Sequence, residues 1–200
     1  QLESIIWNDL VSEHDAENFC VYLERCGIEF TPEFMAFERV WRRDEWNHYL
    51  GFRRIYSMIY GTSEESIGAR LGQQLINFDP ILNFMRDEFS ICLLVAYDEI
   101  VTTKSYSADY EKYRSFGHPA FLKWIKLVTR DEAYHYHNAM EVVRLRHKDR
   151  VPEIRTVVEG ILDVDLSQKD YQGTFVLDHT GPDFSPEFLA GFAELVKNYC

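Results

Sequence analysis

The motif Arg-Asp-Glu-x-x-His occurs twice in this chain, at residues 43–48 and again at residues 130–135. On a helix, the Glu and the His of each copy lie on one face about one turn apart, so both side chains can bind the same metal ion. One Glu-x-x-His arises easily by chance, but two copies with the same Arg-Asp prefix indicate two facing helices that bind a pair of metal ions. In four-helix bundles such a site also takes a bridging Glu from each of two further helices. Two solvated amphipathic helix faces are the alternative.

Two long helices are predicted in the first part of the chain. Residues 2–26 carry apolar side chains at helical spacing, and Gly27 suits a helix C-terminus. The next helix can be capped by Thr31, has Pro32 in its first turn, and runs to about residue 60. We therefore expect an antiparallel helix pair, with the first copy of the motif on its second helix.

The first helix offers two acidic residues one turn apart, Glu13 and Glu17. Antiparallel helices advance at the same rise, so the residue level with Glu45 lies near position 12 or 13. The surroundings of Glu13 are also more apolar, because Glu17 lies near His14 and Glu24. The register favours Glu13 as the ligand, and Glu17 is the alternative.

A third long helix contains the most apolar part of the chain. We expect Asp79 and Pro80 to begin it, after a Gly-interrupted crossover at residues 62–79 that carries a short helix. Residues 91–97 are apolar on every side, which predicts complete burial, and Glu99 follows inside this run. A buried carboxylate requires a compensating cation. We favour a metal ion, with a core salt bridge as the alternative.

The fourth helix is predicted from Pro119 to about Lys148, after a turn near Gly117. Folding the chain at this turn brings Glu99 level with Glu132. After residue 152 the pattern weakens into a helix to about Leu162, an irregular stretch rich in Gly and Asp, and a last helix from residue 186. The chain is thus expected to be one all-α domain, residues 1–200, with a bundle at about 2–148 and a cover at about 150–200 that holds no predicted site.

Composition restricts the partners of this chain. It has 33 Asp and Glu against 21 Lys and Arg, and the net charge of −12 repels nucleic acid and anionic membranes. No apolar run is long enough to span a bilayer, and the N-terminus lacks the basic-then-apolar pattern of a secretory signal. The four cysteines show no C-x-x-C spacing, so we expect buried free thiols and a cytoplasmic setting.

The candidate site combines four carboxylates with two histidines, and four negative charges would neutralise two divalent cations. Oxygen and imidazole ligands suit iron or manganese, and the lack of cysteine disfavours structural zinc. The six candidate ligands are Glu13, Glu45, His48, Glu99, Glu132 and His135.

The Arg-Asp prefix of each motif has a predicted role beside the ligands. A metal-bound imidazole usually donates its second N–H to a carboxylate, so Asp131 could hold His48 and Asp44 could hold His135. Arg43 and Arg130 would then balance these acids. Ordinary surface ion pairs are the alternative for these residues.

The motifs resemble those of the ferritin-like di-iron carboxylate oxidases, and the soluble acyl-carrier-protein desaturases are closest in pattern. The resemblance covers about residues 10–150. In that family paired D/E-E-x-x-H motifs lie on the second and fourth bundle helices, and the spacing of Glu45, Glu99 and Glu132 is similar. The desaturases carry a threonine one turn beyond the third-helix Glu, where this chain has Thr102, and related hydroxylases carry theirs at the place of Thr103.

The resemblance implies a ferritin-like four-helix bundle with a long crossover and additional C-terminal helices. It implies two iron ions, or a manganese–iron pair, with dioxygen as co-substrate, and Thr102 as a catalytic residue that helps to deliver protons. The implied reaction is desaturation or hydroxylation of an acyl chain or another small metabolite, free or tethered to a carrier. A ferredoxin-like electron donor and a homodimer complete the expectation.

Two departures from the desaturase pattern leave alternatives open. The interval from Glu13 to Glu45 is shorter than in desaturases. The extra His that marks a group of di-iron N-oxygenases, four residues before the fourth-helix Glu, is Val128 here, which argues against that activity. An iron-handling protein of the ferritin or rubrerythrin type is the other alternative, although the Cys-rich iron site of rubrerythrins has no counterpart in this sequence.

Overall fold

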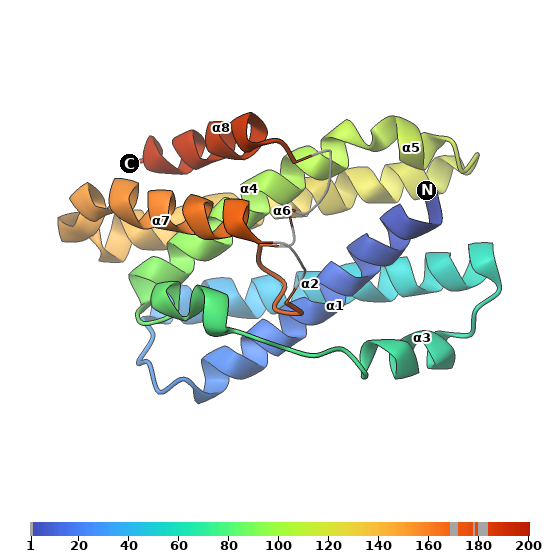
Figure 1. The fold of residues 1–200 in the computed structure, drawn as a ribbon, viewed down its shortest axis with the longest axis horizontal. Coiled ribbons are helices and arrows are strands. Elements are labelled where there is room, and N and C mark those ends of the chain that lie inside the picture. The colour runs from blue at the N-terminus through green and yellow to red at the C-terminus, as the bar shows by residue number, and fades with distance from the viewer. Residues whose placement is uncertain (1, 169–171, 178, 180–183) are drawn as a thin grey trace.

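Four long helices form the centre of the computed structural model, which describes residues 2–168, 172–177, 179 and 184–200 and contains no strand among them. Figure 1 shows these helices as two pairs, and each pair is antiparallel because its helices are joined at one end. Helix α1 packs against α2, α4 packs against α6, and α2 also contacts α6 across the middle. Their bounds are α1 Leu2–Arg25, α2 Pro32–Tyr60, α4 Glu88–Ala108 and α6 Pro119–Arg146.

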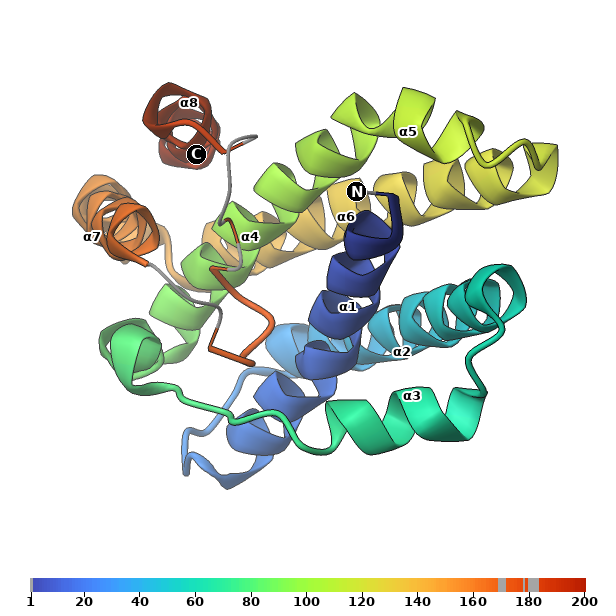
Figure 2. The same ribbon diagram turned by 45° about the vertical axis from the view of Figure 1, so that its right-hand side comes forward.

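Shorter helices fill the connections and the tail. The crossover from α2 to α4 contains α3 and a 3₁₀ helix, η1, and α5 lies in the turn between α4 and α6. In the tail, α7 and α8 pack on each other and on α4, away from α1 and α2 (Figure 2). Their bounds are α3 Glu64–Leu71, η1 Asp79–Phe84, α5 Tyr110–Arg114, η2 Lys148–Glu153, α7 Ile154–Ser167 and α8 Pro186–Lys197.

Most of the predicted helix ends are confirmed. The Thr31 hydroxyl accepts a hydrogen bond from the Phe34 N–H at 3.3 Å, and Pro32 occupies the first turn of α2. Gly27 follows α1 with a φ of 76°, and Gly61 follows α2 with a φ of 70°. Glycine adopts these left-handed conformations without the steric cost that a side chain would add. The antiparallel register of α1 and α2 is therefore fixed by local sequence.

The predicted start of the third long helix is wrong. Asp79 and Pro80 begin the 3₁₀ helix η1, and α4 begins only at Glu88. Asp87 is extended, with a φ of −154°, and its carboxylate accepts the Ser90 N–H at 2.8 Å. Both acids suit a helix N-terminus, and Asp87 makes the capping hydrogen bond of the long helix.

Helix α7 is longer, and the described part of the tail is more polar inside, than the sequence indicated. Helix α7 continues past Leu162 to Ser167, and part of the expected irregular stretch, residues 169–171, 178 and 180–183, lies outside the described residues. The Leu177 N–H donates to Asp98 of α4 at 2.8 Å, and His179 pairs with Asp165 of α7 at 2.8 Å. The first contact attaches the tail to α4 beside Glu99, and the second joins two parts of the tail.

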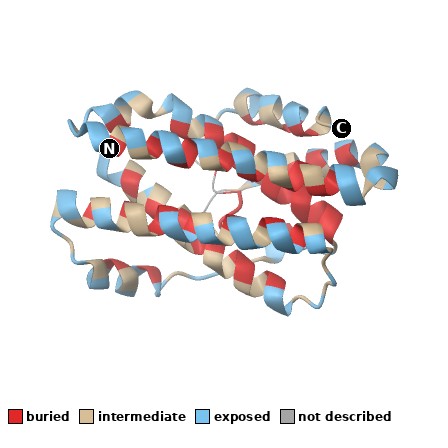
Figure 3. Cartoon of the chain, turned by 180° about the vertical axis from the view of Figure 1, so that it is seen from behind, coloured by how far each residue is buried: buried red, intermediate tan, exposed pale blue. Residues whose placement is uncertain are grey.

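Apolar side chains form two clusters along the long helices. Figure 3 shows the buried residues of these helices in red. The prediction that residues 91–97 are completely buried is confirmed. None of the described helices is long and apolar enough to cross a membrane. The tail-side cluster includes Phe19, Trp41, Leu94 and Ile161, and the turn-side cluster includes Leu10, Phe52, Tyr113 and Ile125.

The four cysteines are free thiols, as predicted. Cys20 and Cys92 are buried in the tail-side cluster. The expectation of burial is wrong for the other two, since Cys26 is half-buried and Cys200 is exposed. Their positions explain the difference, because one follows the end of α1 and the other follows the end of α8.

Helices α2 and α6 approach closely at Gly51, which yields a first prediction. A Cβ atom at this position would lie 2.2 Å from a ring carbon of Trp124, and that ring packs against Phe52 at 4.9 Å. We expect Gly51→Ala to lower the free energy of unfolding by about 1–3 kcal/mol, as overpacking does. Urea denaturation measures the change. The control is Gly68→Ala in α3, where the added methyl group meets open space and the protein should be unchanged or slightly more stable. Equal stability of Gly51→Ala and the parent protein would contradict the close packing.

Candidate metal centre

All six predicted ligand side chains come together between the two helix pairs. They are all buried, with exposed fractions between 1% and 5%. The rings of His48 and His135 have their centroids 6.1 Å apart. On α1, α2 and α6 the site lies between residues of the turn-side cluster and residues of the tail-side cluster, so apolar packing closes both ends. The result is a polar centre inside an otherwise apolar interior.

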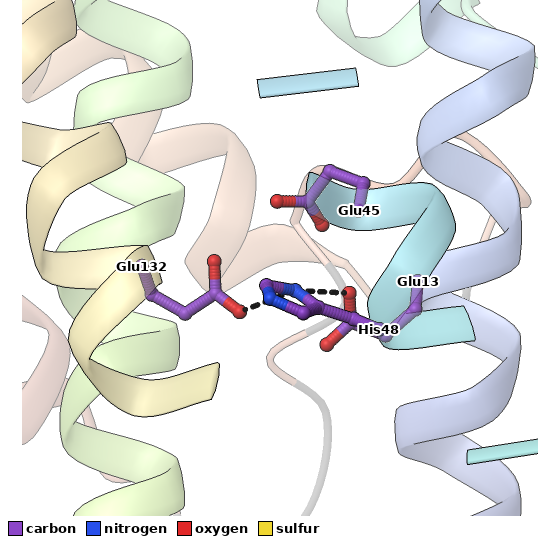
Figure 4. A group of neighbouring side chains, drawn as sticks. All are labelled: Glu13, Glu45, His48 and Glu132. Atoms are coloured by element: carbon purple, nitrogen blue, oxygen red, sulfur yellow. Dashed lines mark ion pairs between the residues drawn. The ribbon is translucent and has the colours of Figure 1, made fainter. Parts of the chain in front are cut away.

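The side chains form two overlapping groups that could each hold one metal ion. Within each group, one possible ligand atom from every residue lies within 4.8 Å of the others. Figure 4 shows the first group, with the His48 ring between the carboxylates of Glu13 and Glu132. The first group is Glu13, Glu45, His48 and Glu132, and the second is Glu45, Glu99, Glu132 and His135.

The residues shared by both groups correct one expectation. We expected the bridging carboxylates to come from the helices without the motif, which are α1 and α4. Instead Glu45 and Glu132, the motif glutamates on α2 and α6, belong to both groups. Helices α2 and α6 contact each other, which brings Glu45 and Glu132 together. Glu13 and Glu99 each belong to one group only.

The two candidates on α1 occupy different environments. Glu13 is buried, and its Oε2 lies 3.3 Å from Nδ1 of His48. Glu17 is one turn further along and pairs with Arg42 at 2.6 Å at the protein surface. Arg42 also binds Glu24, so Glu17 belongs to a surface ion-pair group. Only Glu13 is placed to serve as a ligand from this helix.

Each histidine directs its two ring nitrogens to different partners. Nδ1 of His48 lies 3.2 Å from Glu132, and Nδ1 of His135 lies 3.0 Å from Glu45, so these nitrogens face the shared carboxylates. Nε2 of His48 lies 3.6 Å from Asp131. A carboxylate near the outer nitrogen is the arrangement that orients a metal-binding imidazole.

The second histidine has the matching arrangement on the opposite helix. Nε2 of His135 lies 3.5 Å from Asp44, so each predicted aspartate lies beside the histidine of the other motif. Arg43 contacts Asp44 at 3.0 Å and Arg130 contacts Asp131 at 3.6 Å, both at exposed positions. Each aspartate therefore lies beside the histidine predicted for it across α2 and α6, but neither Nε2 atom has a hydrogen-bond partner.

Two aromatic donors near the site were not predicted from the sequence. The Trp41 indole N–H donates to Oε1 of Glu99 at 2.5 Å, and the Tyr106 hydroxyl donates to Oε1 of Glu13 at 2.5 Å. Both donors are buried. Their spacing was a possible signal, since Trp41 lies one turn before Glu45 on α2 and Tyr106 lies two turns after Glu99 on α4. Aromatic residues at helical spacing are more often ordinary core, so this spacing alone does not identify them as donors.

The two predicted threonines are neighbours on α4 but differ in burial. Thr103 is buried, and its hydroxyl donates to the Glu99 carbonyl oxygen at 2.7 Å. Thr102 is half-buried on α4, three residues after Glu99. The catalytic role of Thr102 stays a prediction from the family resemblance.

The electrostatics of the site reflect four carboxylates in a dry interior. Burial, together with the charge of Glu132, raises the pKa of Glu99 to about 8. Burial also raises the pKa of Glu45, followed by the charges of Glu132 and Glu13. Burial acts against ionisation of Glu132 too, but His48 and His135 outweigh it and hold its pKa below the usual range.

The histidines are shifted toward the charged form. Burial alone would lower the pKa of His48, but the charges of Glu132 and Glu13 outweigh burial and raise it well above its usual value. For His135, burial is outweighed in the same way by the charge of Glu99 and by the nearby Asp44 carboxylate. Protons therefore supply part of the positive charge that this group of carboxylates requires.

Comparison with protein-family models, curated proteins and solved structures gives no match to this chain. The chemical interpretation of the site therefore depends on its own geometry. Among the described residues, six buried side-chain atoms of the candidate ligands have no hydrogen-bond partner, and each such atom costs about 1–3 kcal/mol. Two of them are the outer Nε2 atoms of His48 and His135, and the other four face the centre. A pair of cations would bind the four atoms that face the centre, because carboxylate oxygens and imidazole nitrogens are metal ligands. These atoms are Oε2 of Glu13, Oε1 of Glu45, Oε1 of Glu132 and Nδ1 of His48.

The pKa shifts predict how pH affects the stability of the metal-free protein. Folding raises the pKa of Glu99 from 4.5 to about 8, so the folded state keeps a proton that the unfolded state releases. This stabilisation is complete below the lower value and is lost as the pH rises through the higher one. The raised pKa values of Glu45, His48 and His135 act in the same direction. We expect urea denaturation in the presence of a chelator to show falling stability from about pH 6 to pH 9.

The control for this prediction is Glu99→Gln, which removes a carboxyl group whose pKa folding raises and should flatten the pH dependence. Adding Mn²⁺ should also counteract the loss at high pH, because the metal replaces protons at the same ligand atoms. A metal-free protein that becomes more stable over this pH range would contradict the assigned directions.

Proposed function

We propose that this chain is an oxygen-dependent di-iron oxidase or oxygenase that oxidises a C–H bond of an acyl chain or another small metabolite. The supporting observation is the pair of overlapping ligand groups that share Glu45 and Glu132. Each group provides carboxylates and one imidazole, a set that suits iron or manganese. In this proposal the four long helices are a ferritin-like bundle with a long crossover, and the tail is its C-terminal addition.

Charge balance supports two divalent ions. With both imidazoles neutral, the four carboxylates carry the charge that two such ions neutralise. Glu13 and His48 would complete the ligands of one ion, and Glu99 and His135 those of the other, with Glu45 and Glu132 between them. When bound, reduced iron supplies a place for dioxygen to bind and the electrons that activate it.

The protein's own residues would provide orientation and dryness. Asp131 and Asp44 lie beside the outer nitrogens of the two histidines, at 3.6 Å and 3.5 Å, and would fix the ring orientation when the histidines bind a metal. The two apolar clusters close the ends of the site and exclude water. Thr102, half-buried on α4, is the proposed group for moving a proton. A carrier-tethered substrate, a ferredoxin-like electron donor and a homodimer remain predictions from the resemblance.

The proposed metal site predicts how many ions the parent protein and each variant bind per chain. Purified protein should bind two Fe²⁺ or Mn²⁺ ions per chain after reconstitution. Glu132→Ala should lose both ions, because this carboxylate belongs to both groups, whereas Glu99→Ala should retain one. Metal analysis after desalting measures these numbers. Glu17→Ala is the matched control, since this acid pairs with Arg42 outside the site and should leave two ions bound. Two ions bound to Glu132→Ala would contradict the ligand assignment.

The oxidase part of the proposal predicts substrate-dependent oxygen consumption. Reduced, iron-loaded protein should be incubated with oxygen and candidate acyl, amino-acid and aromatic substrates. Mass spectrometry should detect loss of two hydrogen atoms or gain of one oxygen atom in one of them. Iron oxidation without any change of substrate, in a large cage-like particle, would favour the iron-handling alternative. Particle mass in solution separates the two outcomes.

Substitution of Asp131 should weaken metal binding less than substitution of a ligand. Asp131→Asn keeps the size of the side chain but removes the charge that faces Nε2 of His48. We expect metal affinity or activity to fall about tenfold to a hundredfold while the fold is kept. Titration with Mn²⁺ measures the affinity, and circular dichroism checks the fold. Asp109→Asn, at the end of α4, is a control that should leave metal binding unchanged.

A further inference from the structure

Two of the candidate ligands are each held by one aromatic hydrogen-bond donor. Oε1 of Glu99 accepts the Trp41 indole N–H at 2.5 Å, and Oε1 of Glu13 accepts the Tyr106 hydroxyl at 2.5 Å. These are the two carboxylates that belong to one ligand group only. The shared carboxylates, Glu45 and Glu132, also contact the histidines.

In both cases the donor occupies the oxygen that does not face the histidine. Oε2 of Glu13 lies 3.3 Å from Nδ1 of His48, and Oε2 of Glu99 lies 3.6 Å from Nδ1 of His135. One oxygen of each carboxylate therefore faces the centre, and the other is bound to an aromatic donor. An indole N–H can only donate, so the Trp41 bond keeps its direction in every protonation state of the site.

Packing keeps both donors in place. Trp41 packs edge-on against Phe19 at 5.8 Å and Phe175 at 5.1 Å. Tyr106 packs against Phe52 at 6.0 Å. Both side chains are almost fully buried, so neither can rotate into solvent without opening a cavity. The carboxylates they hold are fixed from outside the metal-binding centre.

Each donor also comes from the helix pair that does not carry its carboxylate. Trp41 is on α2 and holds Glu99 of α4, whereas Tyr106 is on α4 and holds Glu13 of α1. The orientation of each carboxylate therefore depends on the docking of the other pair. This relation matches that of the aspartates, which also reach across to the opposite histidine.

We propose that Tyr106 and Trp41 are positioning residues that restrict Glu13 and Glu99 to binding a metal through one oxygen each. This inference rests on the proposed pair of metal ions. With one atom from each residue, either ligand group supplies four donor atoms to its ion. Manganese and related ions with oxygen ligands accept six, so each ion keeps coordination positions for an external ligand. Removing the donor frees the second oxygen of the carboxylate, which then fills one of these positions.

The test uses Co²⁺ as a probe bound to the full chain. Co²⁺ with four or five ligands absorbs visible light more strongly than Co²⁺ with six, so the absorption per bound ion reports the number of ligands. In Tyr106→Phe we expect lower absorption per ion than in the parent protein and affinity at one of the two positions weakened about tenfold. Trp41→Phe should have the same effect at the other position. Calorimetric titration measures the affinities.

Tyr113→Phe is the matched control. This tyrosine is as buried as Tyr106 and belongs to the same cluster, but its hydroxyl donates to Asp9, which is in neither ligand group. The control should keep the absorption and affinities of the parent protein. If Tyr106→Phe and Trp41→Phe bind two Co²⁺ ions with parent-like absorption and affinities, the inference is wrong and the proposed function stands. If the parent protein binds no pair of Co²⁺ ions, both are wrong.

A second measurement needs no variant and therefore does not depend on how a substitution folds. The separation of the two carboxylate stretching bands in the infrared spectrum is wider for binding through one oxygen than through two. The difference spectrum of the parent protein with and without Co²⁺ should contain the wide separation. A spectrum with only the narrow separation would overturn the inference.

Discussion

Burial of four carboxylates in one small volume is the constraint on which the rest of this structure depends. Glu13, Glu45, Glu99 and Glu132 lie in two overlapping groups with almost no access to water. Such a group is stable only if positive charge enters with it. His48 and His135 provide some of that charge by holding protons, and a pair of divalent cations would provide all of it. The long helices place these acids, and the apolar clusters on either side prevent water from screening them.

Much of the fold followed from short local signals in the sequence. Thr31 with Pro32, and the glycines that follow α1 and α2, fixed those helices, and the Glu45 register then identified Glu13. The start of α4 could not be predicted in the same way. Asp79-Pro80 and Asp87 are both acceptable helix starts, and only tertiary packing decides that the first begins a 3₁₀ helix. Contacts within the tail are also non-local and leave no periodic pattern.

The site was predictable in its members but not in their arrangement. Two Glu-x-x-His motifs identified four side chains, and burial on α4 identified Glu99. Which carboxylates are shared depends on the distance between α2 and α6, and motif spacing does not contain that distance. Trp41 and Tyr106 were missed for a similar reason: each binds a carboxylate on another helix, so nothing near it in the sequence marks it as polar.

The same two donors make the two ligand groups less alike than the repeated Arg-Asp-Glu-x-x-His motif suggests. Both ligand groups contain one histidine, the two shared glutamates and one glutamate of their own. One of these separate glutamates borders a phenol and the other an indole, and the two donors differ in acidity and in ease of oxidation. Two ions in these positions would therefore have unequal affinities and potentials. Such inequality is what a protein requires to load two different metals in a defined order.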